Sequence, residues 1–174
     1  MTMHHFHRLL MLHASDILLS PGMEQSKAFI QHGSTSVYAH SVAVALTCLA
    51  IVHTLHMHVD EHALVRGALL HDYFLYDWHE KDASHRWHGF THPKKALHNA
   101  RRDFEIGKTE EDMIASHMFP LTGRPPSHKE SWVLCLADKV CSAKETVFRN
   151  SGDRRDRKNK SCNKKRAFPR DQSH

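Results

Sequence analysis

The run Ala63-Leu64-Val65-Arg66-Gly67-Ala68-Leu69-Leu70-His71-Asp72 decides the fold, because an apolar helical stretch ends in a histidine followed directly by an aspartate. Asp60 is suited to cap this helix, Glu61 falls in its first turn, and His71 recurs on the apolar face. The pattern predicts a helix from Asp60 to about Tyr73 whose terminal histidine points inward. Burying an imidazole and a carboxylate together is costly unless something compensates both groups, and a divalent metal would do so.

Four more residues of metal-ligand type accompany this dipeptide: His40 before it, and His92, His117 and Asp138 after it. Each lies within or beside a predicted helix, so the chain reads H, HD, H, H, D in order. A single histidine on an apolar stripe, such as His40, is more often a satisfied core residue than a ligand. The six residues therefore indicate a metal site only when they are taken together. Imidazoles with carboxylates suit Fe, Mn, Co, Ni or Zn, and they do not form the all-oxygen cage of Ca²⁺.

The rest of the chain also follows helical periodicity, and no strand pattern of useful length occurs. We therefore predict an all-α bundle of about six to seven helices. Residues 74–91 are expected to form an irregular loop at the mouth of the site. The other predicted helices cover Phe6–Ile17, Glu24–His32, a long segment capped by Ser34, Thr35 or Ser36 and ending near Val59, a segment from Pro93 to Gly107, one that opens at Thr109, and Ser127–Phe148. The last of these is expected to bury a stripe of Val133, Leu136, Val140, Ala143 and Val147, with Asp138 beside it.

The charge is unevenly distributed along the 174 residues, which carry a formal net charge of +5. Residues 149–174 hold ten Lys or Arg against three Asp or Glu, so residues 1–148 are mildly acidic. The sequence predicts one helical domain over 1–148 and a basic, disordered tail over 149–174. A solvated extension is preferred to nucleic-acid binding for this tail. The apolar stretch Val42–Val52 is too short for a membrane span, so we expect a cytoplasmic protein without a membrane partner, and its oligomeric state stays open.

With this order of residues, the chain resembles the HD-domain metal-dependent phosphohydrolases from Val37 to Glu145. The local sequences Leu69-Leu70-His71-Asp72 and Leu136-Ala137-Asp138-Lys139 carry the resemblance. The resemblance implies that a first metal is held by His40, His71, Asp72 and Asp138. It also implies that Asp72 bridges to a second metal held by His92 and His117, as in the two-metal branch of the family.

The chain departs from its suspected relatives at two places. Some two-metal members have two adjacent histidines where this chain has His117-Met118, which makes His88 a candidate additional ligand. Leu75 stands where many phosphodiesterase members have a lysine and where the single-metal nucleotidase branch has a glutamate. The number of bound ions, one or two, therefore stays open.

The resemblance and the residue chemistry together predict an enzyme that hydrolyses a nucleotide or another small phosphoester. Metal-activated water would be the nucleophile, with Asp72 central to the reaction. If a single metal binds, Asp77 or Glu80 is the candidate general base, and Lys139 is the best candidate to contact the phosphate. The alternative is a catalytically silent, metal-binding helical module that acts as a nucleic-acid or signalling adaptor through its basic tail.

Overall fold

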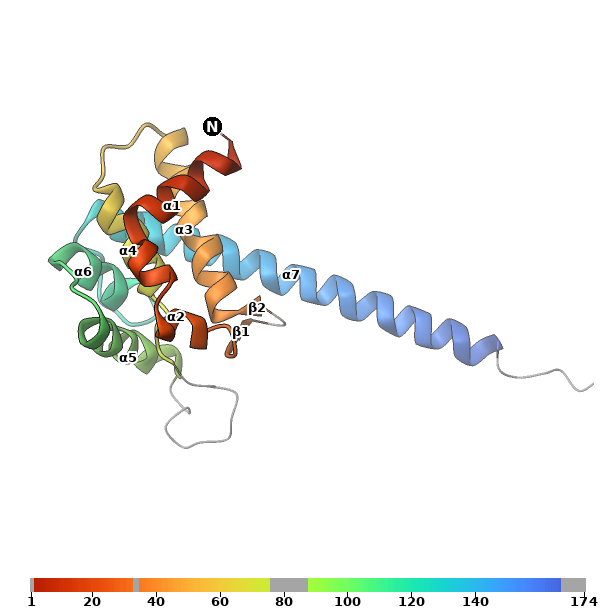
Figure 1. Ribbon diagram of the computed structural model, residues 1–174. Coiled ribbons are helices and arrows are strands. Elements are labelled where there is room, and N and C mark those ends of the chain that lie inside the picture. The colour runs from red at the N-terminus through yellow and green to blue at the C-terminus, as the bar shows by residue number, and fades with distance from the viewer. Residues whose placement is uncertain (1, 33–34, 76–87, 167–174) are drawn as a thin grey trace, which may run out of the picture.

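The computed structural model describes residues 2–32, 35–75 and 88–166 of the chain, and these form seven helices and one small ribbon (Figure 1). The predicted all-α fold is confirmed. In chain order the elements are α1 (Met3–Leu18), α2 (Pro21–Gln25), β1 (Ile30–His32), β2 (Thr35–Ser36), α3 (Val37–Thr54), α4 (Glu61–Leu70), α5 (His88–Asp103), α6 (Lys108–Ser116) and α7 (Lys129–Arg166).

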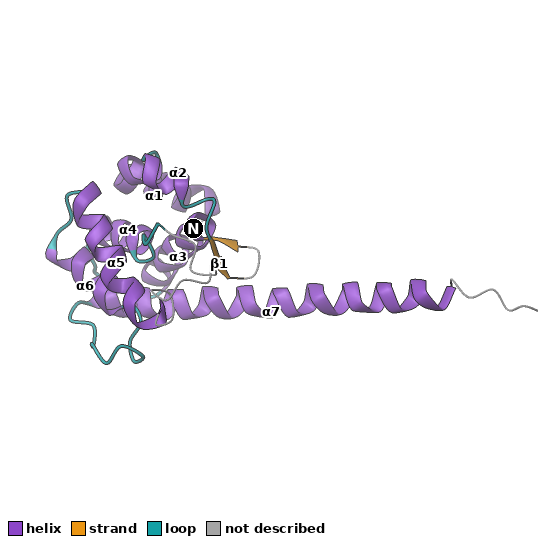
Figure 2. Cartoon of the chain, turned by 90° about the horizontal axis from the view of Figure 1, so that it is seen from below, coloured by secondary structure: helices purple, strands orange, loops and turns teal. Residues whose placement is uncertain are grey.

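Helix α3 is central to the bundle, where it packs against α1, α4 and α7, while α6 packs against α4, α5 and α7 (Figure 2). The apolar side chains of α3 point in several directions, and Val44, Ala45, Cys48 and Leu49 are all fully buried. A helix that is apolar on most sides is typical of a buried position. By length and composition α3 also resembles a membrane span, but here its neighbours are other helices of the same chain.

Local side-chain caps define where the helices that carry the site begin. The Ser36 hydroxyl accepts a hydrogen bond from the Ala39 amide at 3.2 Å, and the Asp60 carboxylate accepts one from the Ala63 amide at 3.0 Å. Such caps satisfy main-chain N–H groups that have no partner within the helix. The predicted starts of α3 and α4 are therefore confirmed together with their capping residues.

Three predicted helix boundaries are wrong, and one of them is the end of α3, which lies at Thr54 and not near Val59. The helix expected over Glu24–His32 is replaced by α2 and by β1, which pairs with β2 in antiparallel register. The Val37 amide donates to the Phe29 carbonyl at 2.9 Å and closes this ribbon, which is too short to produce a sequence pattern. Helix α5 begins at His88, so Pro93 lies inside it; proline in that place loses one main-chain hydrogen bond but does not prevent the helix.

The buried face of α7 is also different from the predicted stripe. Val133 is buried as expected, but Leu136 is 53% exposed and Val147 is 62% exposed. Leu134, Ala137 and Cys141 take their places in the core. This rotation of the helix has a physical reason, because it turns Asp138 inward, where the carboxylate reaches a buried imidazole.

Helix α7 continues past its predicted end near Phe148 and projects away from the body of the protein as far as Arg166 (Figure 1). Lysine and arginine favour helices, and no proline interrupts the chain before Pro169, so the helix runs through Asn150-Ser151-Gly152, the one place where the sequence offers a stop. The structure assigns residues as far as Arg166 to this helix, and the disorder of the segment from residue 149 onward stays a prediction. The division into a helical domain over 1–148 and a separate basic tail stays a prediction, and residues 167–174 lie outside the described residues.

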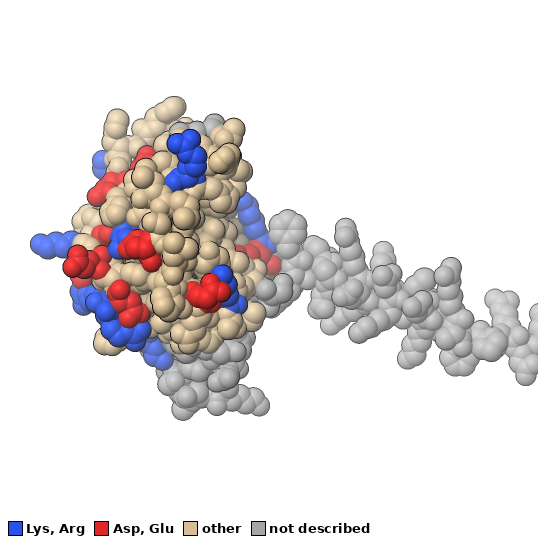
Figure 3. All heavy atoms as spheres, viewed as in Figure 1, with Lys and Arg blue, Asp and Glu red and all other residues tan. Residues whose placement is uncertain are grey.

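On the face of the body shown in Figure 3, basic and acidic side chains are intermixed.

Candidate metal centre

The six predicted ligands converge on one buried place in the bundle. His40 comes from α3, His71 and Asp72 follow the end of α4, His92 lies on α5, His117 follows α6, and Asp138 lies on α7. Their exposed fractions run from 0% for His40 and His71 to 9% for Asp138. Residues separated by almost a hundred positions therefore share one site, as the sequence predicted.

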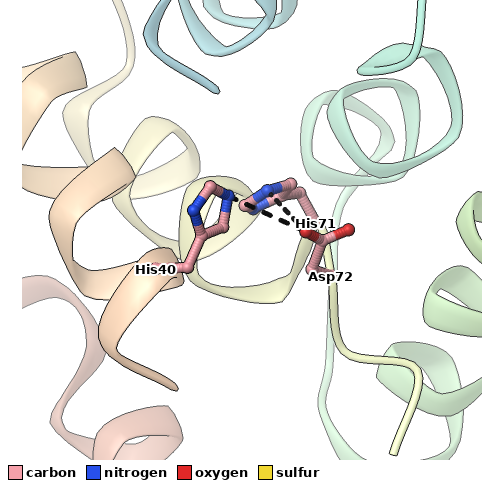
Figure 4. A group of neighbouring side chains, drawn as sticks. All are labelled: His40, His71 and Asp72. Carbon is pink, nitrogen blue, oxygen red and sulfur yellow. Dashed lines mark ion pairs between the residues drawn. The ribbon is translucent and has the colours of Figure 1, made fainter. Parts of the chain in front are cut away.

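The first group of ligand atoms surrounds His40 and His71, whose rings face the Asp72 carboxylate (Figure 4). His40 Nε2 lies 3.2 Å from Asp138 Oδ1 and 3.8 Å from Asp72 Oδ2. His71 Nε2 lies 3.2 Å from Asp72 Oδ2 and 3.9 Å from Asp138 Oδ1. Two imidazole nitrogens and two carboxylate oxygens thus face a common point, as a four-ligand metal site requires.

The second group lies on the other side of Asp72. His92 Nε2 and His117 Nε2 are 2.8 Å apart, and they lie 3.2 and 3.5 Å from Asp72 Oδ1. The two oxygens of Asp72 therefore face different histidine pairs: Oδ2 faces His40 and His71, and Oδ1 faces His92 and His117. This is the arrangement of a carboxylate that could bridge two ions.

The orientation of two imidazoles supports metal binding. His71 and His117 each follow the last residue of a helix, and each Nδ1 donates to the carbonyl three residues earlier, Ala68 at 2.7 Å and Ile114 at 2.8 Å. Carbonyls in the last turn of a helix lack partners within the helix, so they are available for this contact. A neutral imidazole with its proton on Nδ1 presents a lone pair on Nε2, and metal-binding histidines are held in this way.

Two atoms at the centre lack hydrogen-bond partners among the described residues: His71 Nε2 and Asp72 Oδ1. Buried polar atoms are normally satisfied, so these two indicate a ligand that completes the site. A divalent cation fits both, because it accepts electron pairs from nitrogen and oxygen and compensates the buried negative charge. The residues present therefore fit the implied metal.

The buried charges perturb the protonation of the site residues. Burial lowers the pKa of His40, but contacts with the Asp138 and Glu145 carboxylates outweigh it and raise that pKa to about 10. Burial opposes ionisation of Asp138, yet the His40 contact and the His71 charge lower its pKa to about 2. By contrast, burial and the His92 charge lower the pKa of His117 to about 3. Without metal, a proton on His40 would supply the positive charge that the first group needs.

Sequence reasoning missed three residues that support the ligands. Glu145 accepts from His40 Nδ1, with its two oxygens 3.1 and 3.2 Å away. Gln31 Nε2 donates to Asp72 Oδ2 at 2.5 Å, and the Ser142 hydroxyl donates to Asp138 Oδ1 at 3.2 Å. Ser142 and Glu145 follow Asp138 by one and two helical turns, so helical spacing could have identified them. Gln31 had no such signal, because it lies in the unpredicted strand.

Of the remaining predicted site residues, the structure describes the side chain of Lys139 alone, and it is not one of the clustered groups. Lys139 is exposed, and its Nζ donates to the backbone carbonyls of Cys135 at 3.3 Å and His117 at 3.5 Å, so it lies beside the second histidine pair. Its contact with phosphate stays a prediction. Asp77 and Glu80 lie outside the described residues, and so does the side chain of His88.

Comparison with known proteins agrees with this geometry. A family model described as the HD domain matches residues 37–143, which include all six candidate ligands. No curated protein and no solved structure matches the chain.

Proposed function

The chain belongs to the HD-domain family, and from that premise we propose that it is a metal-dependent phosphohydrolase acting on a nucleotide or another small phosphoester. The observation that carries the proposal is the position of Asp72, whose two oxygens face two separate pairs of histidines. One metal would be held by His40, His71, Asp72 and Asp138. The other would be held by Asp72, His92 and His117.

The proposed chemistry needs no nucleophile from the protein. A divalent ion held by these residues would polarise a phosphoryl oxygen and would lower the pKa of a bound water to about 7. The chain's own contribution is orientation: carbonyls hold the rings of His71 and His117, and Glu145 holds the ring of His40. Burial of all these groups strengthens their electrostatic interactions and excludes bulk water.

The charge at the centre favours a phosphorylated substrate. The negative groups beside the imidazoles are the buried carboxylates of Asp72 and Asp138 and the partly buried carboxylate of Glu145. Two divalent ions would exceed these three charges, so the loaded centre would attract an anion. This supports a small phosphoester as the partner. The donor set, mostly imidazole nitrogen with carboxylate oxygen, favours Fe, Mn, Co, Ni or Zn as the ion.

An activity assay with matched variants tests the proposal. Protein loaded separately with each of these metals is assayed against a panel of nucleotides and phosphodiesters, beside Asp72→Ala and the control His98→Ala. His98 is an exposed imidazole on α5, the helix that carries His92. We expect metal-dependent hydrolysis by the wild type and by the control, and loss of activity in Asp72→Ala. Equal background rates in all three proteins would refute the hydrolase and, where metal is bound, would favour the silent metal-binding module.

A further inference from the structure

We propose that Gln31 is a positioning residue that sets the rotation of the Asp72 carboxylate and thereby makes it a bridge between the two metal sites. This inference rests on the proposed function, because it concerns the same centre. Gln31 lies in β1, is 7% exposed, and places its side-chain Nε2 2.5 Å from Asp72 Oδ2.

The chemistry of the two groups fixes which end of the amide faces Asp72. The two oxygens of this carboxylate lie among imidazole nitrogens, with His71 Nε2 3.2 Å from Oδ2 and His92 Nε2 3.2 Å from Oδ1. A carboxylate in such surroundings accepts hydrogen bonds. The amide oxygen of Gln31 would repel it, whereas the amide N–H₂ donates to it.

The hydrogen bond selects one orientation of the carboxylate. Gln31 binds Oδ2, the oxygen that lies 3.2 Å from His71 Nε2. With Oδ2 held on that side, Oδ1 must face the opposite side, where His92 Nε2 is 3.2 Å away. An aspartate side chain rotates easily about its last bond, so an external contact is needed to hold the plane of the carboxylate at the angle that turns one oxygen toward each histidine pair.

The ribbon explains how Gln31 reaches a ligand that lies 41 residues later in the chain. Strand β1 pairs with β2, and Ser36 at the end of β2 caps α3, the helix that carries His40. The same short segment therefore fixes both Gln31 and the start of α3. Asp72 is therefore held from two sides, by its covalent connection to α4 and by the hydrogen bond from Gln31 in the ribbon.

The cost of burying this amide supports a specific role. Gln31 Oε1 is buried and has no hydrogen-bond partner among the described residues. A buried acceptor without a partner is unfavourable, and an apolar side chain of similar shape would fill the space without that penalty. Packing alone therefore does not account for glutamine here, whereas the contact with Asp72 does.

A competing role makes the opposite prediction. If Gln31 only occupies Asp72 Oδ2 until a metal displaces it, its removal would tighten metal binding. If Gln31 positions Asp72, its removal weakens binding at both sites, because Asp72 is shared by both. Outer contacts of metal ligands typically contribute about 10–100-fold to metal affinity.

The test uses Gln31→Met, which keeps the length of the side chain but cannot donate, and Gln31→Asn, whose amide is too short to reach. The control is Gln25→Met, an exposed glutamine in α2. Dissociation constants for Zn²⁺ are measured by competition with a chromogenic chelator on the full chain. The visible spectrum of the Co²⁺-loaded protein reports the ligand geometry, and circular dichroism of the metal-free protein reports folding.

We expect Gln31→Met and Gln31→Asn to bind both equivalents of Zn²⁺ about 10–100-fold more weakly, with an altered Co²⁺ spectrum, while Gln25→Met behaves as the wild type. Unchanged or tighter binding by a folded Gln31 variant would overturn the inference and leave the proposed function intact. A wild-type protein that binds no transition metal would overturn both.

Discussion

Asp72→Asn and Asp138→Asn should lose different amounts of metal-dependent stability, although both replace a buried carboxylate in the same centre. Asp138 approaches only His40 and His71, whereas Asp72 approaches both histidine pairs. Asp138→Asn should therefore weaken one metal site, and Asp72→Asn should weaken two. Asparagine has nearly the shape of aspartate, so the comparison isolates the loss of the ligand charge.

The size of the effect follows from binding linkage. A ligand at 100 times its Kd stabilises the folded state by about 2.7 kcal/mol, so two independent sites would contribute about 5.4 kcal/mol. In a domain of this size each 1 kcal/mol raises Tm by about 2–4 °C, which gives about 5–11 °C for one site and about 11–22 °C for two. We expect the full shift for the wild type, about half of it for Asp138→Asn, and almost none for Asp72→Asn.

Differential scanning calorimetry with saturating Zn²⁺ or with chelator measures this shift for each protein. Each variant is compared with its own metal-free state, so changes in the metal-free fold cancel. Glu24→Gln, which replaces an exposed carboxylate paired with Lys27, serves as the control and should keep the full shift. Equal losses in the two aspartate variants would contradict a two-site centre, and half of the shift remaining in Asp72→Asn would contradict the bridge.

Three further predictions concern protonation and stability. The pKa of His40 is raised to about 10, so a proton must leave its imidazole when metal binds. The affinity of the first site for metal, measured by chelator competition, should therefore rise up to about tenfold per pH unit between about pH 6.5 and 8.5. A metal affinity that does not change with pH would contradict a protonated His40. Arg66 is buried, with its Nη1 2.8 Å from both oxygens of the exposed Asp16 and its Nε 3.8 Å from the buried Glu110. Arg66→Met should lower the free energy of unfolding, measured in urea, by about 3–5 kcal/mol, because it leaves the Glu110 carboxylate buried without its partner. Adding Glu110→Gln to the Arg66→Met chain should recover part of that loss. Burial opposes ionisation of Asp112, but hydrogen bonds donated by the Ser131 hydroxyl and the Ser127 amide outweigh it and lower the pKa of Asp112 below its unfolded value. The ionised form of Asp112 therefore stabilises the fold above about pH 4, and this contribution is lost as the pH falls through the folded pKa. Asp112→Asn should therefore cost about 1–3 kcal/mol at neutral pH and progressively less in acid, and a pH-independent difference in urea unfolding would refute this explanation.

The six candidate ligands could be identified from the sequence because each is tied to a local pattern. His71 and Asp72 end an apolar helix with a recognisable cap at Asp60, and the remaining four residues lie within or beside elements with helical spacing. The residues that hydrogen-bond to these ligands differ in how far the sequence could reveal them. Gln31 approaches Asp72 across 41 residues from a ribbon that has no sequence pattern, whereas Glu145, which approaches His40 across 105 residues, lies two helical turns after Asp138 and could have been found by that spacing.

The buried face of α7 shows the same limit. Its apolar residues allow two faces that differ by a small rotation, and the sequence favoured the one that includes Leu136. The structure buries Ala137 and Asp138 instead, since a carboxylate facing His40 is compensated only when that imidazole is already in place. Helical periodicity thus predicted the fold class by itself, and the order of histidines and aspartates identified the candidate ligands. Only tertiary packing decided the rotation of the Asp72 carboxylate that turns one oxygen toward each histidine pair, because that rotation depends on side chains far apart in the chain.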